Sequence, residues 1–503
     1  MIGGYELFLM LHNLIKFIPF THTAQMRRMI LKKRWAELIK LYEAEYKTKK
    51  LKGNILINYY SARAYTNLKK KREAYELWNE ILWYKNARFQ RLRLAMDLEE
   101  KDELLKIITK DLEDGIKDAE KFYEIYFSKF EMRHPTERDD LKKNLDFLWE
   151  DIQFIQRKNI VQMVTPCGTV SWVMPDDYNL KETHEDLLRM CAHVLLRPMS
   201  KKLLDNWTPS RKAGKRPGLA LSCGIDSIAT LLLMPENTVA LHHRRAFKSM
   251  IKHEKADVTL SKLKEMNKWT IDSIISDHEV LRTTLDKQVG FSTDFATCAH
   301  LILLADYYDL DSIAMGMPID NTYLRKGAKF RVFEKEKFVW RYWRDLFESI
   351  GLSYNCPLAG ISQGGALKIV KEGGLVDFVN SCLRGVGNEG CGKCWKCFHK
   401  NGALGRPFDP TTGEINLFLQ KRPLPTAVHV TWTLQKFDLF YLVPDLEYLE
   451  SLDLSWWENY YPPALKLLPE KYSEFQKNAI EKYLKPMPKP YAIEKINLFP
   501  DLI

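Results

Sequence analysis

The alternation of apolar and polar positions divides the chain into segments of different periodicity. Residues 1–157 are long runs of helix-forming residues with almost no internal Gly or Pro, which predicts an all-helical domain. Within it, 32–46 predicts one helix, and 59–82 has the outline of a tetratricopeptide-type helix pair. A generic helical bundle explains the same pattern, and either would serve as a packing or partner-binding module. The residues expected to face one another across the pair are Ala62, Tyr65, Leu68, Ala74, Leu77 and Trp78.

A different pattern begins near residue 158. Two β-rich runs within 161–174 flank Pro166-Cys167-Gly168, which predicts a hairpin, and a polar linker at 208–218 ends this lead-in section of 158–217. From residue 218 to 402, short apolar strands alternate with helical segments, which predicts an α/β fold: a parallel sheet with helices on both faces. Strands are expected at 218–222, 238–243, 270–277 and 311–317, with helices ending at Pro235 and spanning 296–308. Residues 403–503 are aromatic and Pro-rich and predict a helical C-terminal extension.

Length and composition narrow the class of protein. A chain of 503 residues with 46% hydrophobic and 28% charged residues is expected to form two or three globular domains. The apolar segment 1–20 has no basic residues ahead of it and is interrupted by polar ones, which predicts a packed helix rather than a signal peptide or membrane span. We therefore expect a cytoplasmic protein with no membrane partner. The net charge of +11 admits a nucleic-acid partner, but solvated helix faces also explain it.

The first predicted strand of the alternating section stops at a polar hexapeptide, Ser222-Cys223-Gly224-Ile225-Asp226-Ser227. Gly224 allows backbone amides to point inward, and the following helix presents free N–H groups and the positive end of its dipole. Ser222 and Ser227 add hydroxyl donors. Asp226 would repel phosphates unless a Mg²⁺ lies between them or the carboxylate caps the helix. The hexapeptide therefore predicts a site for a polyphosphate with a metal.

A second glycine-rich segment, 387–394, almost matches a Walker A loop. It ends in Cys394 where Ser or Thr should bind Mg²⁺, and no apolar strand precedes it, so we assign no phosphate site there.

Four cysteines near residue 390 have the spacing C-x8-C-x2-C-x2-C. Four thiolates at such spacing close a tetrahedral zinc site, which would be structural because no position stays open to water. An iron–sulfur cluster is the alternative, since thiolates serve both metals, and a coincidental grouping is the third. The proposed ligands are Cys382, Cys391, Cys394 and Cys397, whereas Cys298 and Cys356 are expected in the core.

Further polar residues follow the predicted strands, where ligands of parallel sheets bind. Asp320 is expected to make a second Mg²⁺ contact. Asp277 and Glu279 could bind metal or ribose, or belong to a solvated loop. His242 begins the segment His-His-Arg-Arg, 242–245, whose arginines either meet an anionic group or form a surface turn.

The hexapeptide resembles the Ser-Gly-Gly-x-Asp-Ser loop of the PP-loop ATP pyrophosphatases. With the four cysteines and the segment 357–362 (Pro-Leu-Ala-Gly-Ile-Ser), the section 215–402 is similar to the QueC family, the 7-cyano-7-deazaguanine synthases. The resemblance implies a Rossmann-like PP-loop fold, and cleavage of ATP to AMP and pyrophosphate. It also implies conversion of a deazaguanine carboxylate to a nitrile with ammonia, and zinc on the four cysteines. It places ATP on residues 222–227, with Ser222, Asp226 and Ser227 catalytic and the adenine near His242.

The chain departs from this family at several positions. Cys223 replaces the first Gly of the loop, and Gln363 stands where the family has Lys, the nearest lysine being Lys368. The family's two substrate segments have no counterpart, and 290–300 and 316–327 occupy those regions. QueC-like proteins with extra domains also occur in bacterial antiviral defence loci, a group that the extra helical domain fits.

We therefore expect an ATP-dependent enzyme that adenylates a carboxylate, deazaguanine-like by resemblance, for nitrile or amide formation with ammonia or a protein amine. The partner protein would dock on the helical domain. The alternatives are a tRNA-thiolating PP-loop enzyme, whose cysteines hold a cluster or carry sulfur, and a catalytically inactive PP-loop scaffold in a defence assembly.

Overall fold

A computed structural model describes most of the chain: residues 22–46, 55–82, 87–98, 106–108, 110, 146–247, 253–285, 287, 289–332, 338–382, 384–385, 389–411 and 413–500. The segment 1–20, expected to be a packed helix, lies outside the described residues. The chain divides into two compact units, 1–131 and 132–503, each considered by itself below.

The first unit is helical throughout its described residues. Its helices are α2 (His22–Leu31), α3 (Trp35–Leu41), a π-helical turn (Tyr42–Tyr46), α4 (Ile55–Asn67), α5 (Lys71–Glu80) and α6 (Ala87–Asp97). The expected helix pair is α4 and α5, whose buried residues share one core. The indole nitrogen of Trp78 donates to the Thr66 hydroxyl at 3.1 Å. Leu68 differs from the prediction, because α4 ends at Asn67 and leaves Leu68 36% exposed.

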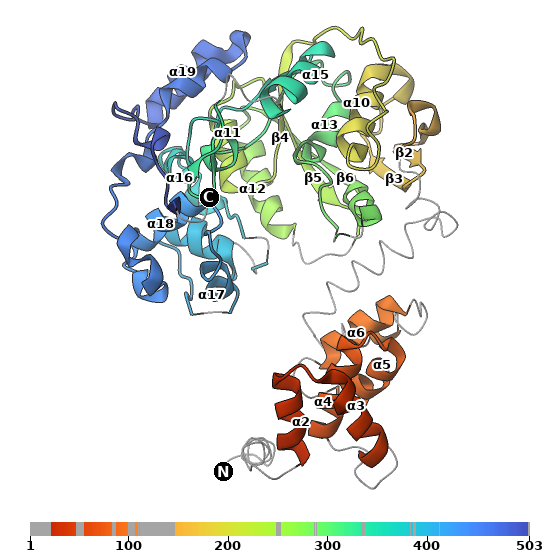
Figure 1. The fold of residues 1–503 in the computed structure, drawn as a ribbon. Helices are drawn as coiled ribbons and strands as arrows, with labels where there is room; N and C mark the ends of the chain where they lie inside the picture. The colour runs from red at the N-terminus through yellow and green to blue at the C-terminus, as the bar shows by residue number, and fades with distance from the viewer. Residues whose placement is uncertain are drawn as a thin grey trace. The chain divides into compact units, whose positions relative to one another are not determined.

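The second unit is built on an eight-stranded sheet of order β1-β2-β3-β6-β5-β4-β7-β10 (Figure 1). The pairings from β6 through β5, β4 and β7 to β10 are parallel, and those among β1, β2, β3 and β6 are antiparallel. The strands are β1 (Gln153–Arg157), β2 (Ile160–Thr165), β3 (Gly168–Val173), β4 (Arg216–Ala220), β5 (Val239–Arg245), β6 (Thr270–Ser276), β7 (Leu310–Ala314) and β10 (Ser353–Asn355). The predicted parallel α/β sheet is therefore confirmed for the five strands β6, β5, β4, β7 and β10, whereas the antiparallel strands β1, β2 and β3 extend it beyond the prediction.

The hairpin predicted at 161–174 is β2 and β3, and it extends the main sheet. β3 pairs with β6, and β1 pairs with β2, so the sheet begins several residues before the expected boundary near 157. The segment 158–217 is therefore part of the sheet unit rather than a separate lead-in.

Helices cover both faces of the sheet because successive strand residues point to opposite sides. In β5, Val239 and Leu241 belong to one core, and Ala240 belongs to the other. The Ala240 core is closed by α11 (Ile225–Leu232), α12 (Glu254–Glu265) and α16 (Gln363–Glu372). The opposite core is closed by α10 (Glu185–Leu196) and α13 (Ala299–Leu303).

The C-terminal section is helical, as expected, but it packs into the same two cores. Its helices are α17 (Gly413–Leu419), α18 (Ala427–Lys436) and α19 (Glu470–Tyr483). The Tyr472 hydroxyl of α19 donates to the Asp311 carboxylate of β7 at 2.7 Å. The remaining short elements are α14 (Ile319–Thr322), α15 (Arg344–Ser349) and the ribbon β8 (Leu324–Arg325) with β9 (Ala328–Lys329).

Candidate functional site

The predicted loop lies at the carboxyl end of β4, where the chain turns into α11. The Ser222 hydroxyl donates to the Ser227 hydroxyl at 3.0 Å, and Ser227 donates in turn to the Gly224 carbonyl at 3.0 Å. The N–H of Ile225, in the first turn of α11, donates to the Ser381 hydroxyl at 3.1 Å. The two serines expected to bind phosphate are therefore neighbours at a helix N-terminus, where the dipole favours an anion.

The left-handed residue of this loop is Cys223, with φ of 59°. Gly224, expected to supply the conformational freedom, instead has φ of −88°, which any residue adopts. A left-handed conformation costs an L-residue about 1–2 kcal/mol, which explains why a glycine suits position 223. The loop still forms because the Cys223 side chain is buried in the core, with its sulfur 3.8 Å from the Nδ1 of His242.

Two carboxylates meet beside the loop, Asp226 on α11 and Asp320 on α14. Burial, and secondarily the Asp226 charge, raises the pKa of Asp320 to about 7, although the N–H of Gln363 donates to Asp320 at 3.1 Å. One oxygen of Asp226 pairs with the Lys400 ammonium, while its other oxygen, Oδ1, is buried without a hydrogen-bond partner among the described residues. A carboxylate pair with an unsatisfied buried oxygen has the chemistry of a divalent-cation site.

Gly316 allows β7 and the loop to approach so closely. A Cβ at this position would lie 2.8 Å from the backbone carbon of Asp226 and 2.9 Å from the nitrogen of Ser227. The carboxyl ends of β4 and β7 therefore bring Asp226 and Asp320 to one point, as the strand order of a parallel sheet predicts.

Three residues of this site were not predicted from the sequence: Ser381, Lys396 and Lys400. Lys400 lies in the π-helical turn Cys397–Asn401, and Ser381 directly precedes Cys382. Burial, followed by the Lys400 charge, lowers the pKa of Lys396. The sequence feature that could have identified these three residues is their position next to the cysteines along the chain, since the cysteine cluster holds the segments that carry them. Gln363 lies beside Asp320, whereas Lys368 pairs with Glu372 at 3.9 Å on α16.

A cavity of about 140 Å³ adjoins the loop at the carboxyl ends of β4 and β5. Its lining includes Ser222, His242 and Glu279, and the Arg245 guanidinium donates to Glu279 at 3.0 Å. Burial lowers the pKa of His242, so its ring is neutral near pH 7. The cavity is mainly apolar and aromatic, which suits a neutral heteroaromatic ring.

The other polar residues considered from the sequence lie away from the loop. The Asp277 carboxylate accepts the N–H of Ser171 at 2.6 Å, so it joins β6 to β3, and burial raises its pKa to about 6. Arg244 pairs with Asp257 of α12. These two side chains have structural partners, whereas Glu279, Arg245 and the two histidines of the segment 242–245 line the cavity.

A larger cavity, of about 510 Å³, is lined in part by Asp320 and Met317. The rest of its lining comes from β8, the turn that follows β8, the segment 330–331 and the start of α18. The basic residues of its lining are Arg325, Lys326 and Arg331, and its acidic residues are Asp294 and Asp320. The excess of basic groups beside the carboxylate pair favours an anionic ligand.

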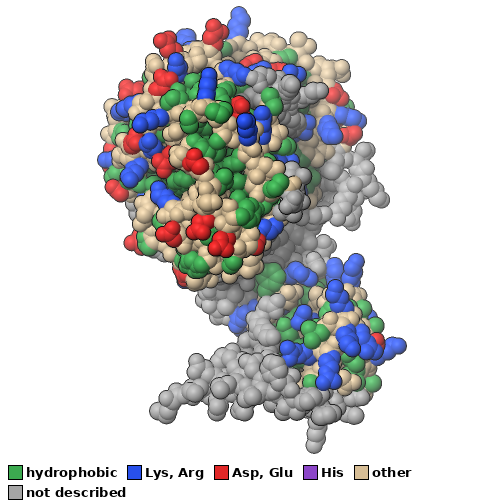
Figure 2. Space-filling view, turned by 60° about the vertical axis from the view of Figure 1, so that its left-hand side comes forward, with side chains coloured by type: hydrophobic (Ala, Val, Ile, Leu, Met, Phe, Trp, Pro, Cys, Tyr) green, Lys and Arg blue, Asp and Glu red, His purple; other side chains and the backbone are tan. Residues whose placement is uncertain are grey.

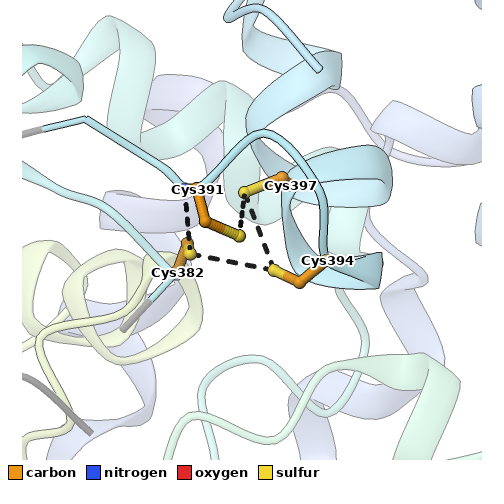
Figure 3. Close-up of side chains that lie close together, drawn as sticks. All are labelled: Cys382, Cys391, Cys394 and Cys397. Carbon is orange, nitrogen blue, oxygen red and sulfur yellow. Dashed lines mark hydrogen bonds between the residues drawn. The ribbon is translucent and has the colours of Figure 1, made fainter. Parts of the chain in front are cut away.

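The four cysteines lie together, with their sulfurs pointing toward one another (Figure 3). The sulfur of Cys394 is 3.7 Å from that of Cys382 and 3.6 Å from that of Cys397, and the Cys391 and Cys397 sulfurs are 3.9 Å apart. A tetrahedral ion with metal–sulfur bonds of about 2.3 Å requires sulfurs about 3.8 Å apart. The cluster therefore fits one metal ion such as zinc, as predicted.

The surroundings of the cluster suit a negatively charged tetrathiolate centre. The Cys391 N–H donates to the Cys382 sulfur at 3.3 Å, and the Asn401 amide donates to the Cys397 sulfur at 3.6 Å. Lys255 of α12 is buried close to these sulfurs, whose charges oppose the lowering of its pKa by burial. The segment 387–394, rejected as a Walker A loop, supplies two of the four ligands.

Comparison with known proteins finds one family model that matches part of the chain. A model described as a family of unknown function (DUF6395) matches residues 342–492, which include the cysteine cluster, Ser381 and Lys400 but not the loop at 222–227. No curated protein and no solved structure matches the chain. Among its described residues, no helix has the length and apolar character that crossing a membrane requires.

Proposed function

We propose that this protein binds ATP with Mg²⁺ at residues 222–227 and cleaves it between the α and β phosphates to activate a carboxylate. The observation that carries the proposal is the meeting of Asp226, Asp320 and Lys400 at the N-terminus of α11, beside the paired hydroxyls of Ser222 and Ser227. A helix N-terminus with hydroxyl donors, carboxylates and a lysine is the donor set of a metal–polyphosphate site.

Each part of the nucleotide has a complementary group. The hydroxyls of Ser222 and Ser227 and the first turn of α11 suit the leaving pyrophosphate. The 140 Å³ cavity beside Ser222 and His242 suits the adenine. The orphaned Oδ1 of Asp226 and the Asp320 carboxylate suit the Mg²⁺, which would neutralise phosphate charge.

Lys400 supplies a cation near Asp320 and Gln363, the position where the resembling family has a lysine. Its ammonium pairs with Asp226, and once a cation binds that carboxylate, Lys400 is released to contact a phosphate oxygen. The cysteine cluster would hold zinc in a structural role, because all four of its ligands are thiolates. It stabilises the segments that carry Ser381 and Lys400.

The acceptor carboxylate would enter the 510 Å³ cavity, where Arg325, Lys326 and Arg331 attract an anion. Its oxygen attacks the α-phosphorus, the bond from that phosphorus to the bridging oxygen breaks, and pyrophosphate leaves. Ammonia or a protein amine then attacks the acyl carbon and displaces AMP, which yields an amide. With ammonia, a second ATP would adenylate the oxygen of this amide, and departure of AMP with that oxygen would leave the nitrile. A deazaguanine-like acid is the substrate that the family resemblance favours.

Product analysis tests this function. The purified protein is incubated with ATP, Mg²⁺, ammonia and candidate deazaguanine acids, and nucleotides are separated by chromatography. AMP and pyrophosphate should appear in proportion to a new acyl product, and little AMP should form without the acid. ADP as the main product contradicts the proposal, as does AMP formation unchanged by Ser222→Ala with Asp226→Ala. Iron and acid-labile sulfide in anaerobically purified protein would favour the thiolation alternative.

A further inference from the structure

The N-terminal unit has a cavity of about 850 Å³ lined by α4, α5, α6 and the turn between α4 and α5. Of the described residues that line it, four are cationic, Arg63, Lys69, Lys71 and Arg93, and none is Asp or Glu. Lys and Arg side chains are prominent on the face of this unit seen in Figure 2, and acidic ones are scarce there. Like charges gathered in one concavity repel one another, so the arrangement favours an anionic partner.

The wall of this cavity is ordered by packing. The rings of Tyr59 and Trp78 meet edge to face with centroids 5.6 Å apart, and the Trp78 indole donates to Thr66. The Arg63 guanidinium lies 5.7 Å from the centroid of the Tyr59 ring. Lys69 has φ of 60° and makes the short turn from α4 to α5. The cationic side chains are thus displayed on a preformed framework, which lowers the entropy cost of binding.

We propose that this cavity binds an acidic peptide segment of a partner protein. Arg63, Lys69 and Arg93 would pair with Asp or Glu side chains. Neutral groups on the same wall, those of Asn67 and Gln90, would hydrogen-bond to the peptide backbone. This binding site lies in the first unit, and its existence does not depend on the proposed ATP chemistry.

A nucleic acid fits the cavity less well. Proteins that bind single strands stack bases on exposed aromatic faces, but Tyr59 and Trp78 are only 8% and 1% exposed. Duplex binding relies on cations distributed along a stripe that follows the phosphates, whereas these cations converge on one cavity.

Fluorescence anisotropy of the full chain tests the proposal. The probes are a fluorescein-labelled decapeptide of glutamate and a labelled thymidine decanucleotide, each titrated at low and physiological salt. Saturable peptide binding should weaken by about tenfold in Arg63→Glu with Arg93→Glu, because two favourable charge pairs become repulsive. The matched control is Lys32→Glu with Lys40→Glu, which makes the same change in net charge at exposed positions outside the cavity. It should leave the peptide affinity within about twofold.

Three results would overturn the proposal: no peptide binding, an equal loss in the control pair, or tighter cavity-dependent binding of the oligonucleotide. The milder pair Arg63→Gln with Arg93→Gln, checked by circular dichroism, separates lost binding from lost folding. It should weaken peptide binding in the same direction and by less. Unchanged peptide affinity in this folded pair would also contradict the proposal.

Discussion

The buried carboxylate of Asp320 is predicted to lower the free energy of unfolding by an amount that depends on pH. Asp320→Asn removes a buried carboxyl whose pKa rises from 3.8 to about 7 on folding, and it keeps an oxygen that accepts the Gln363 N–H. Because the folded state holds this proton more tightly, ionisation costs stability as pH rises from about 4 to 7. The full penalty of about 4 kcal/mol applies above that range. Without metal, the free energy of unfolding of the variant should therefore equal that of the wild type near pH 4. At pH 8 it should be higher than that of the wild type by up to about 4 kcal/mol.

The assay is urea unfolding at pH 4 and pH 8, followed by a near-ultraviolet signal of the sheet unit. Asp186→Asn is the matched control, since Asp186 is also buried. Burial raises the pKa of Asp186, but hydrogen bonds from Ser210, Trp207 and Arg211 outweigh this and lower it. A carboxylate whose pKa is lowered by folding stabilises the folded state at every pH above its pKa in the unfolded chain. The control variant, which lacks this carboxylate, should therefore be less stable than the wild type at pH 8.

Saturating ATP with Mg²⁺ should narrow the difference in unfolding free energy between the wild type and Asp320→Asn, by about 2.7 kcal/mol at a ligand concentration 100 times Kd. The wild type binds the metal through an ionised Asp320 and gains stability by mass action, whereas the variant gains little. An Asp320→Asn variant no more stable than the wild type at pH 8 without metal, or stabilised equally by ATP with Mg²⁺, would refute the reasoning.

The remaining predictions concern the cluster, the lysine and the loop. Cys394→Ser should lose zinc, measured by elemental analysis at one ion per wild-type chain, and should lower the melting temperature, because structural zinc contributes directly to folding; retained zinc would contradict this. Lys400→Met should abolish pyrophosphate release, and adding Gln363→Lys should restore part of it; full activity in the single variant would exclude the role given to Lys400. Cys223→Gly relieves the left-handed strain but removes a buried sulfur. The free energy of unfolding measured in urea should therefore change by no more than about 1 kcal/mol, and the ATP affinity should stay unchanged. A loss above about 2 kcal/mol would show that the packing of the sulfur outweighs the strain.

Local periodicity predicted six of the eight strands of the main sheet, and β1 and β10 were not predicted. The apolar runs at 218–222, 238–243, 270–277 and 311–317 correspond to β4, β5, β6 and β7, because a strand buried on both faces needs a short continuous apolar run. The hairpin around Pro166 was recognisable from its turn residues for the same local reason. The four cysteines were identified as one cluster because their ligand spacing is itself a local property.

Tertiary structure alone decided which distant residues complete the site. Lys400 reaches Asp226 across 174 positions of the chain, and Ser381 reaches Ile225 across 156. No periodicity links such residues, since their proximity depends on the cysteine cluster folding against the carboxyl end of β4. The left-handed conformation of Cys223 was likewise hidden, because a loop's dihedral angles follow from the elements it joins. The sequence by itself therefore predicted most of the strands, the loop, the carboxylates Asp226 and Asp320 and the grouping of the four cysteines. Long-range packing decided which cation lies beside these carboxylates and which cavities adjoin them.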